Sequence, residues 1–385
     1  MVFLLASFAG IAPLSWDMTL AAMPLLTRDF STTPEHVQLT LSLFAIGFGV
    51  GQLFYGPLSD RYGRKPVLLG GFALYVLTSV GCAFAADINQ LIVLRLLQGL
   101  GGCVGPVLSR AIVRDLYDRS EGARKLSLMT TITAAAPVVA PVIGGLLVSL
   151  VGWPGIFVTL ALLGLATLVG ALLFLAESNP HIDLQALRPR NITGNWGRFF
   201  GNRRCLAFAA INACIYAAIF CYISGSSFVM MDRYGLSPRA FGFIFMLTAF
   251  GLMGGAYTNA RLVRRWPTDR IMLTGFALTT LAATLVLAAL ATGWGGPLAV
   301  AFPTMLYAFS MTFIMPNSVA AAMEPMPEIA GSVSSLIGFL QMMAGALAGY
   351  LVNLLFIPTG GWGLGACMLG FTLIAVAAYV ISARK

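Results

Sequence analysis

Asp17 and Arg95 are the residues of this chain with the clearest chemical potential, because each places a charge inside a long apolar segment. Asp17 lies in the segment 2–27 and Arg95 in the segment 88–109. An ionised side chain at the centre of a bilayer costs about 2.5–3.5 kcal/mol on insertion scales. Burial therefore favours the neutral form of the Asp17 carboxyl, which could take up and release a proton. A carboxylate that only pairs with another helix is the simpler interpretation.

The two charged residues are expected at similar depths in the membrane. Arg95 lies about 10 Å from the start of its segment at 1.5 Å per residue, and Asp17 lies about 15 Å from the same face. We expect them to pair or to share a water-filled cavity, so that a proton and a substrate compete for one carboxylate. The alternative is a static ion pair that orders two helices.

The elements that must hold these residues are membrane-spanning helices. The chain has 385 residues, 58% of them hydrophobic and 10% charged, with a mean hydropathy of +0.87, which excludes an ordinary soluble protein. A spanning helix needs about 20 apolar residues. Twelve segments qualify: 2–27, 36–59, 66–86, 88–109, 126–151, 154–176, 205–231, 240–260, 271–292, 297–323, 329–357 and 361–383.

The predicted fold is therefore an all-α polytopic membrane protein with twelve transmembrane helices. The polar stretch 177–204 is the longest break between spans and divides the chain into six-helix halves, 1–176 and 205–385. Two six-span halves suggest a substrate site between them and alternating access by rocking. No ionisable Asp, Glu, Lys, Arg or His occurs in the spans of the second half, which offer Asn212 and Tyr216 among many Phe and Met residues. We predict proton handling in the first half and an adaptable apolar wall in the second.

The charges are distributed unevenly between the two membrane faces. One face holds 19 of the Lys and Arg residues in its turns and tail, and the other holds only Arg28, Arg233 and Arg239. By the positive-inside rule both termini are expected in the cytoplasm. The net charge of +9 therefore indicates topology and not nucleic-acid binding. The six cysteines all fall in predicted spans and are expected to be reduced packing residues.

A charged turn between the second and third spans, at 60–65, is predicted to be a gate. It contains Asp60, Arg61, Arg64 and Lys65. Gly56 and Gly63 are expected to allow close approach or unusual backbone angles, and Pro57 and Pro66 to mark helix ends. A solvated topology signal explains part of this charge. The mixed charges at 114–125, including Asp115, are interpreted as a solvated face.

Four stretches resemble motifs of the major facilitator superfamily. The turn from Gly56 to Lys65 is similar to the signature GxLxDRxGRK, and RLLQG at 95–99 is similar to the fourth-span RxxQG motif. APVIGG at 140–145 resembles the fifth-span GPxxGG antiporter motif, with alanine in place of its first glycine. DMTLAAMP at 17–24 resembles the DMYLPALP stretch of Bcr/CflA-type drug:proton antiporters, with Thr19 and Met23 among the departures.

The resemblance implies roles for several residues. Asp60 would face the start of the eleventh span, and this contact would close the cytoplasmic side and break as the halves rock. The turn residues would then act as gate residues and not as cargo contacts. Pro137, Pro141, Gly144 and Gly145 would permit a bend and close packing in an antiport-specific seal, with a passive kink as the alternative. Gln98, one turn from Arg95, could donate to substrate, orient the guanidinium or bond between helices.

The predicted function is proton-coupled efflux of small, largely apolar compounds. The transporter is expected in the lipid bilayer of the bacterial inner membrane, as a monomer. The resemblance implies antibiotics such as bicyclomycin or amphenicols as substrates. A transporter of a polar metabolite, such as a sugar or amino acid, is the alternative. No phosphate-binding GK[ST] motif, HExxH or Cys/His cluster occurs, so we expect no cofactor and no metal. An intramembrane enzyme would need a second acid or a nucleophile beside Asp17, and a non-transporting sensor stays open.

Overall fold

The computed structural model describes residues 1–179, 182–359 and 361–383. Within these residues it is all helical, and twelve helical segments are long and apolar enough to cross a membrane. The all-α fold and the number of spans are thereby confirmed. The first six spans are built from α1 Val2–Leu20, α2 Met23–Asp29, α3 Pro34–Tyr62, α4 Arg64–Ala83, α5 Ile88–Gly102, α6 Val104–Leu116, α7 Arg119–Thr133, α8 Ala136–Val151 and α9 Pro154–Phe174.

The last six spans follow a helical linker. Its helix is α10, Pro189–Gly201. The spans are α11 Arg203–Ser227, which continues into the π-helix η1 Phe228–Arg233, α12 Pro238–Leu262, α13 Thr268–Thr292, α14 Gly296–Met311, α15 Met315–Met323, the short η2 Pro327–Ile329, α16 Ala330–Thr359 and α17 Gly363–Ala383. We call α1 to α9 the first half and α11 to α17 the second half. The boundaries 1–176 and 205–385 stay a prediction.

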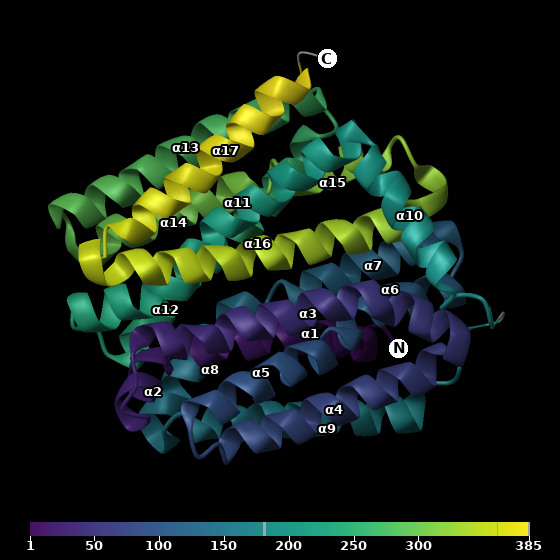
Figure 1. Ribbon diagram of the computed structural model, residues 1–385, viewed down its shortest axis with the longest axis horizontal. Coiled ribbons are helices and arrows are strands. Elements are labelled where there is room, and N and C mark those ends of the chain that lie inside the picture. Colours follow the sequence, from purple (N-terminus) through teal and green to yellow (C-terminus); the bar gives the residue numbers. More distant parts are fainter. Residues whose placement is uncertain (180–181, 360, 384–385) are drawn as a thin grey trace.

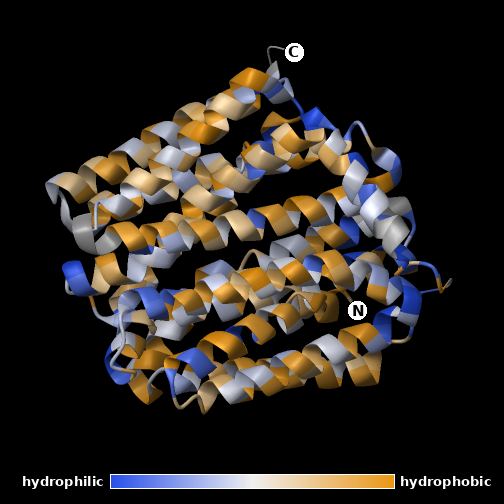
Figure 2. Cartoon of the chain, viewed as in Figure 1, coloured by the Kyte–Doolittle hydropathy of each residue, from blue (hydrophilic) through white to orange (hydrophobic). Residues whose placement is uncertain are grey.

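The two halves lie against each other, and their helices run between the same two ends of the molecule (Figure 1). Hydrophilic residues gather at both ends of the helices, and apolar residues cover the length between them (Figure 2). We call the end with α10, the α3–α4 turn and the N-terminus the linker face, and the end with α2 and η1 the far face. This arrangement buries the backbone hydrogen bonds of each helix in the apolar layer, as a bilayer requires.

Contacts between the halves are most extensive along α3–α16 and α8–α12. Glycines allow both approaches. A Cβ on Gly49 would lie 2.9 Å from the Cβ of Met342, and a Cβ on Gly242 would overlap the carbonyl oxygen of Pro141. Small residues at such positions let helix backbones come close in a membrane, where packing rather than hydrophobic exclusion holds helices together.

Several spans are interrupted in ways that hydropathy does not indicate. The first breaks at 21–22, the fourth at Cys103, the fifth at 134–135 and the tenth at 312–314. Pro57, by contrast, lies inside α3 and does not mark its end. The predicted turn at 60–65 is also shorter than expected: α3 continues to Tyr62 and α4 starts at Arg64, so that Gly63 alone separates them.

Candidate functional site

Asp17 lies near the middle of the first span, where the two halves meet. Its side chain is half-buried and makes no hydrogen bond or ion pair with any described residue. The neighbouring Trp16 packs edge-on against Phe220 of the second half, with ring centroids 5.3 Å apart. Tyr216, one turn before Phe220 on α11, lies within electrostatic range of Asp17. The carboxylate is therefore placed at the interface between halves, with its hydrogen-bonding capacity unused.

Arg95 is fully buried in the first half and contacts neutral groups. Its Nη1 donates to Oε1 of Gln98 at 2.6 Å, and Nε2 of Gln98 donates to Oγ of Ser79 at 2.7 Å. The guanidinium carbon lies 4.3 Å from the ring centroid of Phe44, in cation–π geometry. Gln98 thus orients the guanidinium and also bonds between α5 and α4, which are two of the alternatives that the sequence left open.

Asp17 and Arg95 form no ion pair among the described residues, so the first predicted arrangement, direct pairing, is not present in this structure. The nearest link is long: Nη2 of Arg95 donates to the carbonyl oxygen of Ser15 at 3.5 Å, two residues before Asp17. Whether the two side chains share a water-filled cavity stays a prediction.

Asn212 bonds the broken tenth span, and its predicted role as a substrate contact stays a prediction. Its Nδ2 donates to the carbonyl oxygen of Met315 at 3.1 Å and to Oγ of Ser318 at 3.2 Å, where the tenth span resumes as α15. Its Oδ1 has no partner among the described residues. The amide donor of Asn212 therefore bonds backbone and side-chain groups of the broken span, while its buried acceptor has no such partner among the described residues.

The predicted gate turn is a network within the first half. Nη1 of Arg64 donates to Oδ1 of Asp60 at 2.5 Å, and Nε donates to Oδ2 of Asp115 at 2.8 Å. Asp115 is only 13% exposed, which corrects its interpretation as part of a solvated face. Arg61 lies over the ring of Tyr62, and Nζ of Lys65 donates to the carbonyl oxygen of Leu172. The described contacts of the Asp60 side chain do not include α16, and the predicted closing contact is not made in this conformation.

Glu177, at the start of the linker, fixes the backbone of this turn. Its carboxylate accepts backbone hydrogen bonds from Asn179, Arg64, Lys65 and Ser178. Burial by itself raises the pKa of Glu177, but these hydrogen bonds outweigh it and hold the pKa below its usual value. The contact is complete at neutral pH and is lost as the pH falls through the lowered pKa.

The two glycines of the turn differ. Gly63 has φ +94°, and a Cβ there would lie 2.5 Å from Oε2 of Glu177, so both the conformation and the space call for glycine. Gly56 has helical backbone and open space around its Cα, so the expectation of close approach or an unusual angle is wrong for it in this structure.

The fifth span contains the predicted antiporter residues. It breaks one residue before α8, Pro137 lies in the first turn of α8, and Pro141 lies inside it. A Cβ on Gly144 would overlap the carbonyl oxygen of Met18, and one on Gly145 would overlap that of Pro238. These glycines therefore pack α8 against α1 and against α12 of the other half. The seal function stays a prediction.

Residues that the sequence did not single out also join the halves at the far face. Nη2 of Arg28 lies 3.7 Å from Oδ1 of Asp232, and Oγ of Ser224 donates to Oε1 of Gln38 at 3.3 Å. The one sequence signal for this ion pair was that Arg28 and Asp232, which have opposite charges, lie at the ends of the first and seventh spans. Among the described residues no group of three or more His, Cys, Asp or Glu could hold a metal ion.

The match to a family model now decides the family. The model of the Major Facilitator Superfamily matches residues 5–349. This chain belongs to the major facilitator superfamily. It is a multi-pass membrane transporter, and its relatives support the Bcr/CflA-type resemblance.

Three relatives match almost the whole length of this transporter. An uncharacterized MFS-type transporter YdgK of Bacillus subtilis is 33% identical over 92% of this chain and 88% of that protein. A bicyclomycin resistance protein homolog of Haemophilus influenzae is 29% identical over 100% and 96%. A chloramphenicol resistance protein of Pseudomonas aeruginosa is 30% identical over 92% and 84%.

Solved structures of the superfamily share the fold. The crystal structure of a POT family transporter with a thioalcohol-conjugated peptide has a TM-score of 0.80 at 14% identity, covering 99% of this chain and 96% of that one. This likeness bears on architecture alone.

Proposed function

We propose that this transporter exchanges protons for small, largely apolar compounds across the bacterial inner membrane by alternating access. The observation that carries the proposal is the carboxylate of Asp17, half-buried in the middle of a span and without a partner among the described residues. An intramembrane acid is costly and is therefore a functional group by default. Because Asp17 lies beside the Trp16–Phe220 contact between halves, rocking of the halves would change its surroundings.

The carboxylate has the geometry for exchange. With no fixed counter-ion, Asp17 is free to accept a proton or to bind a donor group of the cargo, and only one of the two fits at a time. Arg95 would contribute a long-range positive field and not a direct pair. Exchange of a neutral compound for one inward proton would draw about 2.3 kcal/mol per 100 mV and about 1.4 kcal/mol per pH unit.

The proposed orientation in the membrane rests on the charges. The linker face, rich in Lys and Arg, would be cytoplasmic with both termini. Among the described residues, the Ser224–Gln38 hydrogen bond and the Arg28–Asp232 ion pair join the halves toward the far face, while the described contacts of the Asp60 side chain do not include α16. The structure would then represent the state that loads cargo from the cytoplasm, with the gate turn closing in the opposite state and the α8–α12 contact preventing leak.

The cargo class rests on the relatives and on the second half. The relatives named for bicyclomycin and chloramphenicol resistance support neutral antibiotics as substrates. A polar metabolite would need several fixed polar partners. The amide donors of Asn212 and Asn317 already bond the broken tenth span, which leaves few groups for such a cargo. We propose a functional monomer without a cofactor or enzymatic activity.

Proton release by purified protein tests this function. Adding chloramphenicol or bicyclomycin to the wild type in weakly buffered detergent solution should release protons, and Asp17→Asn should release none, because no other acid lies in the body of a span. Asp87→Asn is the matched control, since asparagine can keep the helix cap that Asp87 makes with the backbone of Gln90. Drug-driven release that persists in Asp17→Asn would disprove the coupling role.

A further inference from the structure

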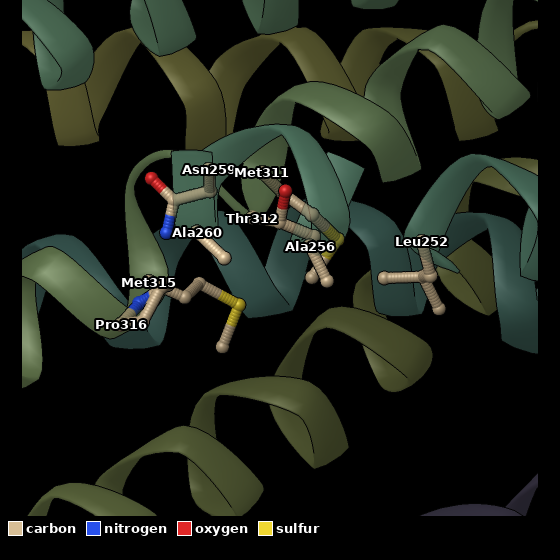
Figure 3. A pocket seen from close by; sticks show the side chains of 8 residues that line it. All are labelled: Leu252, Ala256, Asn259, Ala260, Met311, Thr312, Met315 and Pro316. Carbon is tan, nitrogen blue, oxygen red and sulfur yellow. The ribbon is translucent and has the colours of Figure 1, made fainter. Parts of the chain in front are cut away.

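A cavity of about 360 Å³ lies beside the break in the tenth span (Figure 3). It is bounded by α12 on one side and by the segment that joins α14 to α15 on the other. A cavity of this volume is at the lower end of the range that accepts a small organic molecule. It is separate from Asp17 and from the gate turn, because none of their residues lines it.

One lining residue of the cavity, Ala260, lies on the stripe of α12 that is directed toward the first half. Near the far face this stripe contains Gly242, which contacts α8. Ala260, which lines the cavity, follows about five helical turns later on the same stripe. The cavity therefore lies on the linker side of the contact between α8 and α12.

Asn259 supplies an unused hydrogen-bond donor to this cavity. Nδ2 of Asn317 donates to the carbonyl oxygen of Phe313 at 2.8 Å and to Oδ1 of Asn259 at 3.2 Å, which fixes the Asn259 oxygen toward Asn317. The Asn259 nitrogen then points to the side of Ala260 and Met315 (Figure 3). It has no partner among the described residues, although the residue is only 9% exposed.

The rest of the lining defines what fits. The hydroxyl of Thr312 donates to the carbonyl oxygen of Phe309, so its oxygen can still accept a hydrogen bond. Ala256, Ala260, Met311 and Met315 are apolar, and the two methionines can adapt their shape to a ligand. No ionisable side chain lines the cavity. A neutral molecule with an apolar body and one hydrogen-bond acceptor matches this surface.

We propose that this cavity is a capture subsite for the cargo, which binds there through a carbonyl or similar acceptor before it reaches Asp17. The proposal rests on the proposed efflux function and names a second place where the same cargo binds. Binding on the linker side would raise the local concentration of cargo in the state that loads from that face, and it requires no proton.

Transport kinetics of chloramphenicol in proteoliposomes test the subsite. Ala260→Phe should fill the cavity and raise KM about five-fold or more while the maximal rate stays within about two-fold, because Asp17 is untouched. Asn259→Leu should raise KM about five-fold through the lost hydrogen bond. Met253→Phe, on the same helix but 44% exposed and outside the lining, is the control and should keep the wild-type KM.

The alternatives give different results. An unchanged KM in folded Ala260→Phe overturns the subsite, and if this variant also retains less co-purified lipid, the cavity holds an acyl chain instead. Should Ala260→Phe lose its thermal transition, Ala260→Leu takes its place under the same criteria. Absence of proton-driven chloramphenicol transport in the wild type would overturn the proposed function, and the subsite for this cargo with it.

Discussion

At the scale of single residues, the buried Arg95 is the feature that most needs a physical account. A guanidinium without a carboxylate partner would normally be too costly to bury. Here its charge lies against the electron-rich face of Phe44 and one nitrogen donates to Gln98, which is in turn held by Ser79. These neutral contacts depend on the planar shape of arginine and not only on its charge.

We therefore expect Arg95→Lys to be a damaging change. Lysine keeps the positive charge but loses the stacked plane, so the unfolding free energy should fall by about 1–3 kcal/mol. The measurements are the thermal midpoint in detergent and transport in proteoliposomes, and both should fall. Arg264→Lys, in an exposed turn, should change neither. Equal stability and transport in Arg95→Lys would show that charge alone is required at this position.

At the scale of helices, close backbone contacts decide how the halves meet. The α8–α12 contact depends on Gly145 and Gly242, each of which faces a carbonyl oxygen of the opposite helix. Proline in α8 contributes as well, because Pro141 provides one of those oxygens. The antiporter-like motif thus has a direct packing role near the far face.

Gly242→Ala should loosen this contact. The added methyl group would overlap the carbonyl of Pro141, at a cost of about 1–3 kcal/mol for overpacking. Double electron–electron resonance between spin labels at the exposed positions Leu150 and Arg239 should report longer label-to-label distances than in the wild type. Gly254→Ala is the control on the same helix, since a Cβ there would meet only ordinary contacts at 3.6 Å and beyond. Identical distances in the two variants would contradict the packing role.

At the scale of the whole molecule, the far-face contact is held mainly by packing. The Arg28–Asp232 ion pair is exposed, with side-chain exposures of 77% and 43%, and pairs of this kind contribute about 0–1 kcal/mol. The longer α3–α16 and α8–α12 contacts carry most of the interface. An interface held by packing and not by fixed ion pairs suits a transporter whose two states must differ little in free energy.

The topology of the molecule gives a direct prediction. A green fluorescent protein fused to the C-terminus should be fluorescent in bacterial cells and an alkaline phosphatase fused there should be inactive, because the positive-inside rule places this end in the cytoplasm. Fusions after Ala86, between α4 and α5, should show the reverse pattern. Active phosphatase at the C-terminus would contradict the proposed orientation in the membrane.

The sequence alone determined the number of spans, the uneven distribution of charge and the family, because these depend on local hydropathy and on short motifs. It also located the lone intramembrane acid, Asp17, and the need for glycine at Gly63. Each of these properties belongs to a residue and its neighbours in the chain, so no tertiary contact is needed to recognise it.

Only the tertiary structure decided which residues contact each other. In the structure Arg95 contacts Gln98 and Phe44, and Asn212 donates a hydrogen bond to the broken tenth span. Asp115 and Glu177 accept hydrogen bonds from the gate turn. Helix breaks and hydrogen-bond partners depend on the rotation and depth of helices that are distant in sequence. Hydropathy averages over a whole span and carries no information about either.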